Sequence, residues 1–260
     1  MARGCSKKME GKKAAILGSK VDIVDSKETL AIIEEIIRSS NPTQIVTLNA
    51  EIAYNAQYDS RLSELIKTAK LVTPDGIGII WAGHVLGYKF KERVTGIDLV
   101  YSLCRVAAQK GYRVYLLGAA PGIAKAAGEN LINEYPHLNI CGTHHGYFTP
   151  LEHDFLVTEI KKRAPEILFV GLGAPKQEYW IKEHLQELDV PVCIGVGGSF
   201  DVIAGLKKRA PAVFIKLNLE WLYRLASEPK RLKRQLVLPK FIIAVIKQRL
   251  QMCLSKGKSQ

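Results

Sequence analysis

The chain has 260 residues, of which 47% are hydrophobic, enough for one large α/β domain with an appendage or for two small domains. Its net charge of +12 is uneven: residues 205–260 hold 14 Lys and Arg against two acids, whereas the remaining 23 basic and 23 acidic residues balance. Five scattered cysteines without a CxxC pair argue against a disulfide framework, and no apolar run approaches the ~20 residues that span a bilayer.

Three regions are expected along the chain. Residues 1–13 are basic, and no apolar segment follows them, so we expect a disordered extension rather than a secretory signal. Residues 14–204 are expected to form the α/β domain that carries the chemistry. Residues 205–260, where the composition turns basic, are expected to form a helical appendage that meets a polyanion.

Helical and strand-like patterns alternate in chain order. Helices are expected at 26–39 (with Ser26 as a possible cap), 50–69, 96–110, 121–134, 150–163, 176–188, 212–227 and 239–254. Strands are expected at 44–49, 71–73, 113–117, 167–170 and 192–196. These strands are apolar throughout, as is typical when both faces of a sheet are buried. The alternation predicts a mostly parallel, Rossmann-like sheet flanked by helices, with the basic helical appendage at its C-terminal end.

Ligands of an open parallel sheet bind beyond the carboxyl ends of its strands. Five polar or glycine-rich turns follow the predicted strands, at 47–49, 73–76, 118–122, 171–178 and 195–201. Backbone N–H groups in such turns suit phosphates, although tight βα turns need glycines in any case. None of the turns matches GxGxxG, so a Rossmann-type NAD(P)-dependent oxidoreductase is the weaker interpretation.

Asp75 lies between Pro74 and Gly76 at a strand end, where a carboxylate can serve as general base for a sugar hydroxyl. An Asx turn or a helix N-cap is an equally good interpretation of the same residue. The adjacent pair His144-His145 has no further ligand set beside it, and the chain contains no DxD motif. We therefore expect no metal and no cofactor, and any diphosphate would be held by Arg, Lys and backbone donors.

An ordered set of motifs resembles the signatures of the WecG/TagA/CpsF glycosyltransferase family. The set comprises TPDG (73–76) with ERVTGID (92–98), GLGAPKQE (171–178), GVGGSFD (195–201) with RAP (209–211), and EWLYRL (220–225) with EPKR (228–231). Any one of these motifs is weak evidence, but their order over roughly residues 20–235 is specific.

The resemblance implies an inverting glycosyltransferase of cell-envelope polysaccharide synthesis. In the most similar branch, N-acetylmannosamine passes from UDP to the 4-hydroxyl of N-acetylglucosamine on undecaprenyl diphosphate. The product is the β-1,4 linkage of the wall teichoic acid linkage unit. A different UDP-hexose donor for another envelope polysaccharide stays open as an alternative.

The resemblance also implies roles for individual residues. Asp75 would be the general base, Thr47 and Asn49 would hold the donor sugar or phosphate, and Gln177 would position a sugar. Thr47, Asp75 and Gln177 form the expected catalytic set. The further expected substrate contacts are Arg93, Gly118, Gly173, Gly197, Asp201, Arg224, Arg231 and Arg234. The last three would bind the acceptor's diphosphate, since Arg matches phosphate geometry.

The basic tail predicts an interaction with an anionic membrane surface. From 239 to 258, Lys240, Lys247 and Gln251 fall on a polar stripe beside a broad apolar remainder, a pattern typical of interfacial helices. The alternative is a helix whose apolar face docks on the core or on another subunit, and homo-oligomers in solution are one way to cover that face. The basic run 230–234 also permits a nucleic-acid contact, but no motif supports one. We expect a cytoplasmic protein at the inner face of the plasma membrane, with no nucleic-acid partner.

Overall fold

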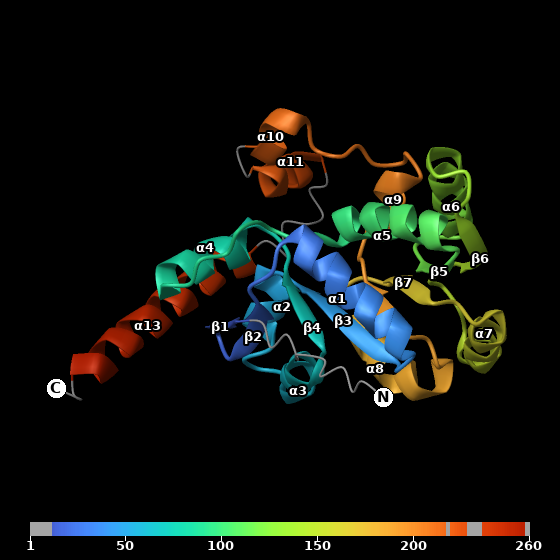
Figure 1. The fold of residues 1–260 in the computed structure, drawn as a ribbon. Helices are drawn as coiled ribbons and strands as arrows, with labels where there is room; N and C mark the ends of the chain where they lie inside the picture. The colour runs from blue at the N-terminus through green and yellow to red at the C-terminus, as the bar shows by residue number, and fades with distance from the viewer. Residues whose placement is uncertain (1–11, 217–218, 228–235, 258–260) are drawn as a thin grey trace, which may run out of the picture.

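The computed structural model describes residues 12–216, 219–227 and 236–257 (Figure 1). Its main sheet has six strands in the order β4-β3-β8-β7-β5-β6, and every neighbouring pair is parallel. The strands are β3 (Thr43–Leu48), β4 (Leu71–Pro74), β5 (Arg113–Gly118), β6 (Asn139–His144), β7 (Ile167–Gly171) and β8 (Val192–Gly195). The expected α/β class with a parallel sheet is confirmed.

Helices cover both faces of this sheet. They are α1 (Ser26–Ser39), α2 (Ala50–Asn55), α3 (Ser60–Thr68), α4 (Ile77–Leu86), α5 (Gly96–Lys110), α6 (Ile123–Glu134), α7 (Pro150–Arg163), α8 (Lys176–Leu188), α9 (Ser199–Ile203), α10 (Ala212–Lys216), α11 (Glu220–Ser227) and α13 (Val237–Gly257). Helices α1, α5 and α6 supply the core on one face, and α7 and α8 supply it on the other. In Figure 1, α10 and α11 stand apart from these layers.

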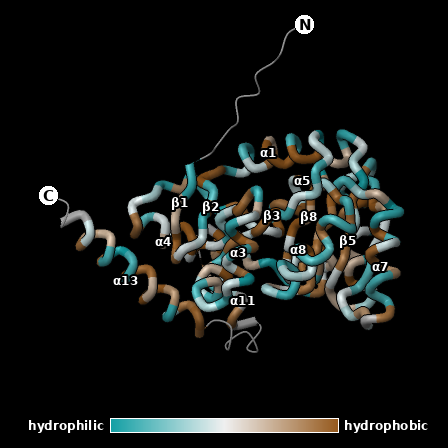
Figure 2. Tube along the Cα trace, turned by 90° about the horizontal axis from the view of Figure 1, so that it is seen from below, coloured by the Kyte–Doolittle hydropathy of each residue, from teal (hydrophilic) through white to brown (hydrophobic). Residues whose placement is uncertain are grey.

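The strands in the middle of the sheet are apolar at every position because helices cover both of their faces. In β7, Ile167 and Phe169 pack with α1, α5 and α6, whereas Leu168 and Val170 pack with α7 and α8. All four side chains are fully buried. Figure 2 shows the same result as hydrophobic stretches gathered inside the molecule around β3, β8 and β5. A strand with two buried faces has no polar side to alternate with.

Three sequence expectations are wrong in detail. The helix expected at 50–69 is divided into α2 and α3, because the Asp59 side chain accepts the Leu62 N–H (3.0 Å) and starts a new helix. The helix expected at 212–227 is likewise divided into α10 and α11. Helix α1 has the expected bounds, but its N-cap is Asp25 in a capping box with Glu28, not Ser26.

The sequence analysis also missed a β-hairpin, β6, α4 and α9. The hairpin pairs β1 (Lys13–Ile16) with β2 (Ser19–Asp22), so the expected extension ends before Lys13, and its residues 1–11 lie outside the described part of the chain. Buried Asp22 joins the hairpin to the main sheet, since its carboxylate accepts the Val72 N–H at 2.8 Å. Strands of four residues with mixed polarity carry too little periodicity to be recognised.

Helix α13 packs against α2 and α4 (Figure 1). Phe241 and Val245 are buried in the cluster that these helices form. The Gln248 side chain accepts the Leu17 N–H (2.9 Å) and donates to the Ala15 carbonyl (3.0 Å), so it also binds the β1–β2 turn. The alternative in which the C-terminal helix docks on the core is therefore confirmed for one face of α13. Within the described ranges, no helix is both long and apolar enough to cross a membrane.

We predict that acid destabilises the contact between α7 and α8. Burial, together with the charge of His153, holds the pKa of His184 below its ordinary value. The unfolded chain therefore takes up this proton first, and the free energy of unfolding should fall as the pH drops through about 6.5. Urea unfolding between about pH 7.5 and 5.5 measures the decline, which His184→Gln should reduce. Exposed His137 provides the control, because His137→Gln should leave the decline unchanged; equal slopes in both variants would contradict this assignment.

Candidate active site

The junction of β3 and β8 is the position where this sheet should bind a ligand. The helix after β3 enters the cluster beside the hairpin, where Ile52 and Ala53 are buried. The helix after β8 goes to the other face, where Phe200 and Ile203 pack with α5 and α6. Adjacent parallel strands whose following helices diverge in this way form the topological switch point of an open sheet.

Two buried side chains hold the loop that follows β8. The Thr47 hydroxyl donates to the Gly195 carbonyl at 3.0 Å, which joins the ends of β3 and β8. The Gln177 side-chain carbonyl accepts the Gly197 N–H at 2.9 Å, and its amide donates to Glu178 at 2.8 Å. Thr47 is 4% exposed and Gln177 is 2% exposed. These two residues of the expected catalytic set therefore converge on one loop, whose shape they support.

The close approach of Gln177 explains a glycine in this loop. A Cβ atom at Gly195 would lie 2.5 Å from the Gln177 amide nitrogen. Only glycine leaves room for the buried amide at this point. The motifs that end β8 and begin α8 are thus two halves of one packing unit.

Asp75 lies at the carboxyl end of β4, next to this junction. Its N–H donates to the Leu48 carbonyl at 2.8 Å, and the Pro74 carbonyl accepts the Val94 N–H at 2.9 Å. The side chain is half-buried. The N-cap of α4 is Gly76, so the alternative in which Asp75 is the N-cap residue is wrong. Asp75 is therefore held by its backbone between β3 and the segment that leads into α5.

Uncapped helix N-termini gather at the same edge of the sheet. No N-cap side chain accepts a hydrogen bond at the start of α4 or α8, where the N-cap residues are Gly76 and Pro175. In contrast, α2 begins with Asn49, whose side chain accepts the Ile52 N–H at 3.0 Å. At α8 the Gln177 N–H already donates to the Gly173 carbonyl at 3.0 Å. The first N–H groups of α4 are thus left for another acceptor, and a phosphate at a helix N-terminus is a common one.

The other expected substrate contacts are more scattered. Gly118 is a packing residue, since a Cβ there would lie 2.5 Å from the Gly171 backbone. Gly173 accepts the Gln177 N–H at the start of α8, and Asp201 on α9 pairs with Lys207 at 2.9 Å. Arg224 belongs to α11, but its side chain lies outside the described residues, as do Arg231 and Arg234.

His144 and His145 do not form part of a recognisable metal centre. The His144 ring contacts the carbonyl of His145 at 2.8 Å. In the part of the chain that the structure describes, no group of three or more His, Cys, Asp and Glu residues is arranged to hold a metal ion.

The sequence also matches a known protein family and several of its members. A sequence model of the "Glycosyl transferase WecG/TagA/CpsF family" matches residues 14–253. The chain belongs to this family. A Staphylococcus aureus (strain MW2) relative named "N-acetylglucosaminyldiphosphoundecaprenol N-acetyl-beta-D-mannosaminyltransferase" is 38% identical over 88% of the chain and 93% of its own length. A Bacillus spizizenii protein of the same name is 35% identical over 88% of the chain and 90% of its own length.

The family motifs meet as pairs in the structure. Arg93 of ERVTGID forms an ion pair with Glu220 of EWLYRL at 3.1 Å, and their side chains are 16% and 12% exposed. Asp98 of the same motif forms an ion pair with Arg209 of the RAP motif at 2.5 Å. Both pairs join the segment after α9 to residues 93–98, which run into the first turn of α5 and also contact Pro74 through Val94. Arg93 pairs with α11 in this structure, and its expected contact with the donor stays a prediction.

Sequence reasoning missed Glu220, Asp98 and Arg209 as site-forming residues. All three stand inside the family motifs: Asp98 in ERVTGID, Arg209 in RAP and Glu220 in EWLYRL. The available signal was the opposite charge of residues in these motifs, but a single sequence does not say which charges pair.

We predict that the Arg93–Glu220 ion pair contributes more to stability than an exposed pair does. A double-mutant cycle with Arg93→Gln and Glu220→Gln should give a coupling energy of about 1–3 kcal/mol in urea unfolding, because both side chains are largely removed from solvent. The control is the exposed Lys125–Glu129 pair on α6, for which we expect about 0.3–0.5 kcal/mol. Equal coupling energies in the two cycles would contradict the prediction that this ion pair stabilises the contact between α11 and the rest of the protein.

Proposed function

We propose that the chain transfers N-acetylmannosamine from UDP to the 4-hydroxyl of N-acetylglucosamine on undecaprenyl diphosphate, with inversion to a β-1,4 linkage. The reaction would belong to synthesis of the wall teichoic acid linkage unit. Two relatives that match most of the chain carry the name of this mannosaminyltransferase. Family membership over residues 14–253 favours glycosyl transfer over nicotinamide-dependent oxidation.

The position of Asp75 carries the proposal. This half-buried carboxylate lies between the end of β3 and the uncapped N-terminus of α4. In the proposed step, Asp75 removes the proton from the acceptor hydroxyl while the oxygen attacks the anomeric carbon of the donor. The bond from that carbon to the UDP oxygen breaks in the same displacement, so a single base and a stabilised leaving group are sufficient for inversion.

The leaving diphosphate needs donors that do not depend on a metal. The N–H groups at the start of α4 are oriented along the helix axis, and the N-terminal end of a helix favours anions. Asn49 uses its side-chain oxygen to cap α2, which leaves its amide N–H groups for the donor sugar or phosphate. Thr47 and Gln177 would act by fixing the β8–α9 loop against which the donor lies. Arg224, Arg231 and Arg234 are proposed to bind the acceptor's diphosphate.

We predict that Asp75→Asn lowers turnover by about 10²- to 10⁴-fold, since the amide cannot accept the acceptor proton. UDP binding by calorimetry and the melting temperature should both stay close to those of the unaltered chain. The matched control is Asp154→Asn, because Asp154 is a carboxylate on α7 with 98% of its side chain exposed. Turnover by Asp75→Asn at the level of the control would remove Asp75 from the mechanism.

The donor sugar is the finer part of the proposal. A different UDP-hexose for another envelope polysaccharide is the alternative within the same family. Incubation of the unaltered chain with several UDP-sugars and a short-chain lipid-diphosphate acceptor, followed by mass spectrometry, separates the two. A product with any sugar other than N-acetylmannosamine as the preferred one would favour the alternative.

Helix α13 is proposed to bring the enzyme to the inner face of the plasma membrane. Its outer side, opposite Phe241 and Val245, exposes an apolar stripe formed by Ile242, Ile243, Ile246, Leu250 and Leu254. Leu250 is 59% exposed and Leu254 is 70% exposed. Arg249 lies to one side of this stripe, and α13 contains no acidic residue. An apolar stripe beside cations suits the boundary between lipid headgroups and acyl chains. A second copy of the chain is the other partner that could cover the stripe.

We predict that Ile246→Gln with Leu250→Gln weakens binding to vesicles containing anionic lipid by about tenfold or more, because each substitution removes apolar surface from the lipid contact. The control is Leu151→Gln with Phe155→Gln, which replaces two exposed apolar residues of α7 that are 92% and 72% exposed. Cosedimentation measures both variants. Unchanged vesicle binding, together with loss of a lipid-free dimer in gel filtration, would assign the stripe to self-association instead.

A further inference from the structure

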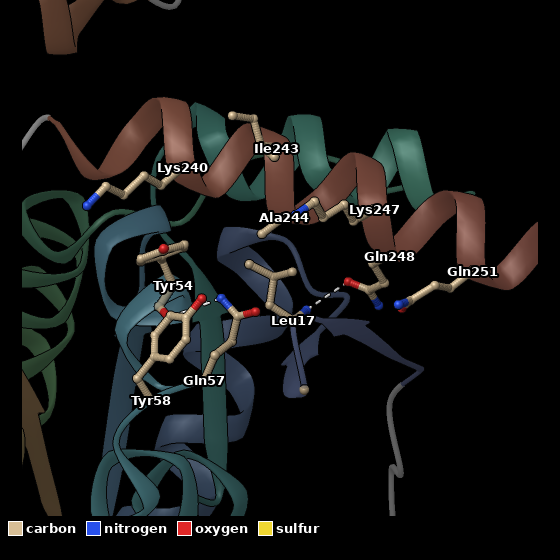
Figure 3. A pocket seen from close by; sticks show the side chains of 11 residues that line it. Leu17, Tyr54, Gln57, Tyr58, Lys240, Ile243, Ala244, Lys247, Gln248 and Gln251 are labelled. Carbon is tan, nitrogen blue, oxygen red and sulfur yellow. Dashed lines mark hydrogen bonds between the residues drawn. The ribbon is translucent and has the colours of Figure 1, made fainter.

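A groove runs along α13 on the side that faces α2 and the β1–β2 turn (Figure 3). Its volume is about 520 Å³. Residues from three separate parts of the chain line it: Leu17, Gly18, Tyr54, Gln57, Tyr58, Lys240, Ile243, Ala244, Lys247, Gln248 and Gln251. Because the Gln248 side chain binds the β1–β2 turn, α13 is held at the edge of the groove.

The charge of this groove is entirely positive. Lys240 and Lys247 stand seven residues apart on α13, which is about two helical turns, and both are exposed on the same side of the helix. No carboxylate lines the groove, and no ion pair of either lysine occurs among the described residues. Two cations that share a groove without a carboxylate attract an anion rather than one another.

The rest of the lining can bind the neutral part of a polar ligand. Tyr54 and Tyr58 form one wall with ring centroids 5.3 Å apart, and Tyr58 is 75% exposed. Gln57 and Gln251 add amide groups. Phenols and amides both donate hydrogen bonds to phosphate or ester oxygens, and tyrosine is a residue that favours positions with one apolar and one wet side.

Ile243 connects the groove to the apolar stripe of α13. It lines the groove and is also 55% exposed on the outer side of the helix, next to Ile246 and Leu250. A ligand with an anionic head and an apolar tail would therefore place its head against the lysines of the groove and its tail along the apolar stripe. A free phosphate would contact only the lysines.

From this arrangement we infer that the groove binds the headgroup of an anionic phospholipid, with the phosphate between Lys240 and Lys247 and the acyl chains along the α13 stripe. The inference deepens the proposed function and rests on its membrane contact. The proposed function requires only a general attraction between the basic helix α13 and an anionic membrane. The inference adds one specific site for a lipid headgroup.

The test compares two variants that lose the same charge from opposite sides of α13. Lys240→Gln with Lys247→Gln removes both cations of the groove. Arg249→Gln with Lys89→Gln removes two exposed cations outside it, and the Arg249 guanidinium lies near Gly87, on the α4 side of the helix. Each lysine near an anionic surface contributes to binding, so both variants should bind less well to vesicles with phosphatidylglycerol in phosphatidylcholine. The groove variant should lose about tenfold more affinity than its control, whereas equal losses would overturn the inference.

Soluble probes separate the sources of the phosphate. Dihexanoyl phosphatidylglycerol below its micelle concentration should bind the unaltered chain in a titration followed by calorimetry, and the groove variant should bind it at least about tenfold more weakly. Inorganic phosphate should bind much more weakly than the short-chain lipid. Equal binding of the two probes, or a lipid-free dimer that the groove variant abolishes, would overturn the inference. Failure of the transferase proposal is distinguishable, because it would appear as absent sugar transfer by the unaltered chain in an assay without vesicles.

Discussion

The structure depends on how two buried polar side chains satisfy the backbone at the end of β8. A parallel sheet covered on both faces leaves its chemistry to the loops at the carboxyl edge, and such loops need fixed hydrogen-bond partners to hold one shape. The Thr47 hydroxyl binds the Gly195 carbonyl, and the Gln177 carbonyl binds the Gly197 N–H. These bonds fix the switch point between β3 and β8 from both sides, and Asp75 lies at the next strand end.

The charged family motifs are best understood as contacts between distant segments. Arg93 with Glu220, and Asp98 with Arg209, join the chain after α9 to residues 93–98 at the start of α5. Val94 continues this link to Pro74, beside Asp75. In this structure the Arg93–Glu220 pair joins α11 to the segment beside the candidate base.

Helix α13 shows how one amphipathic pattern can serve two surfaces. Phe241 and Val245 bury one side against α2 and α4, while Ile246 and Leu250 remain exposed on the other. The sequence contains both sets at helical spacing, so periodicity alone predicts a single broad apolar face. Only the packed structure divides that face into a core contact and an outer stripe, with the cationic groove between α13 and α2.

The sequence by itself determined the α/β class, the parallel sheet and the approximate bounds of the longest helices, because buried strands and amphipathic helices are patterns of local spacing. The resemblance of its motifs to a known family also brought out Thr47, Asp75 and Gln177. Tertiary structure decided their surroundings: which loop Gln177 supports, which residue caps α4, and which acid pairs with Arg93. These contacts join residues up to 127 positions apart, as Arg93 and Glu220 are, and no local pattern specifies a partner at that distance.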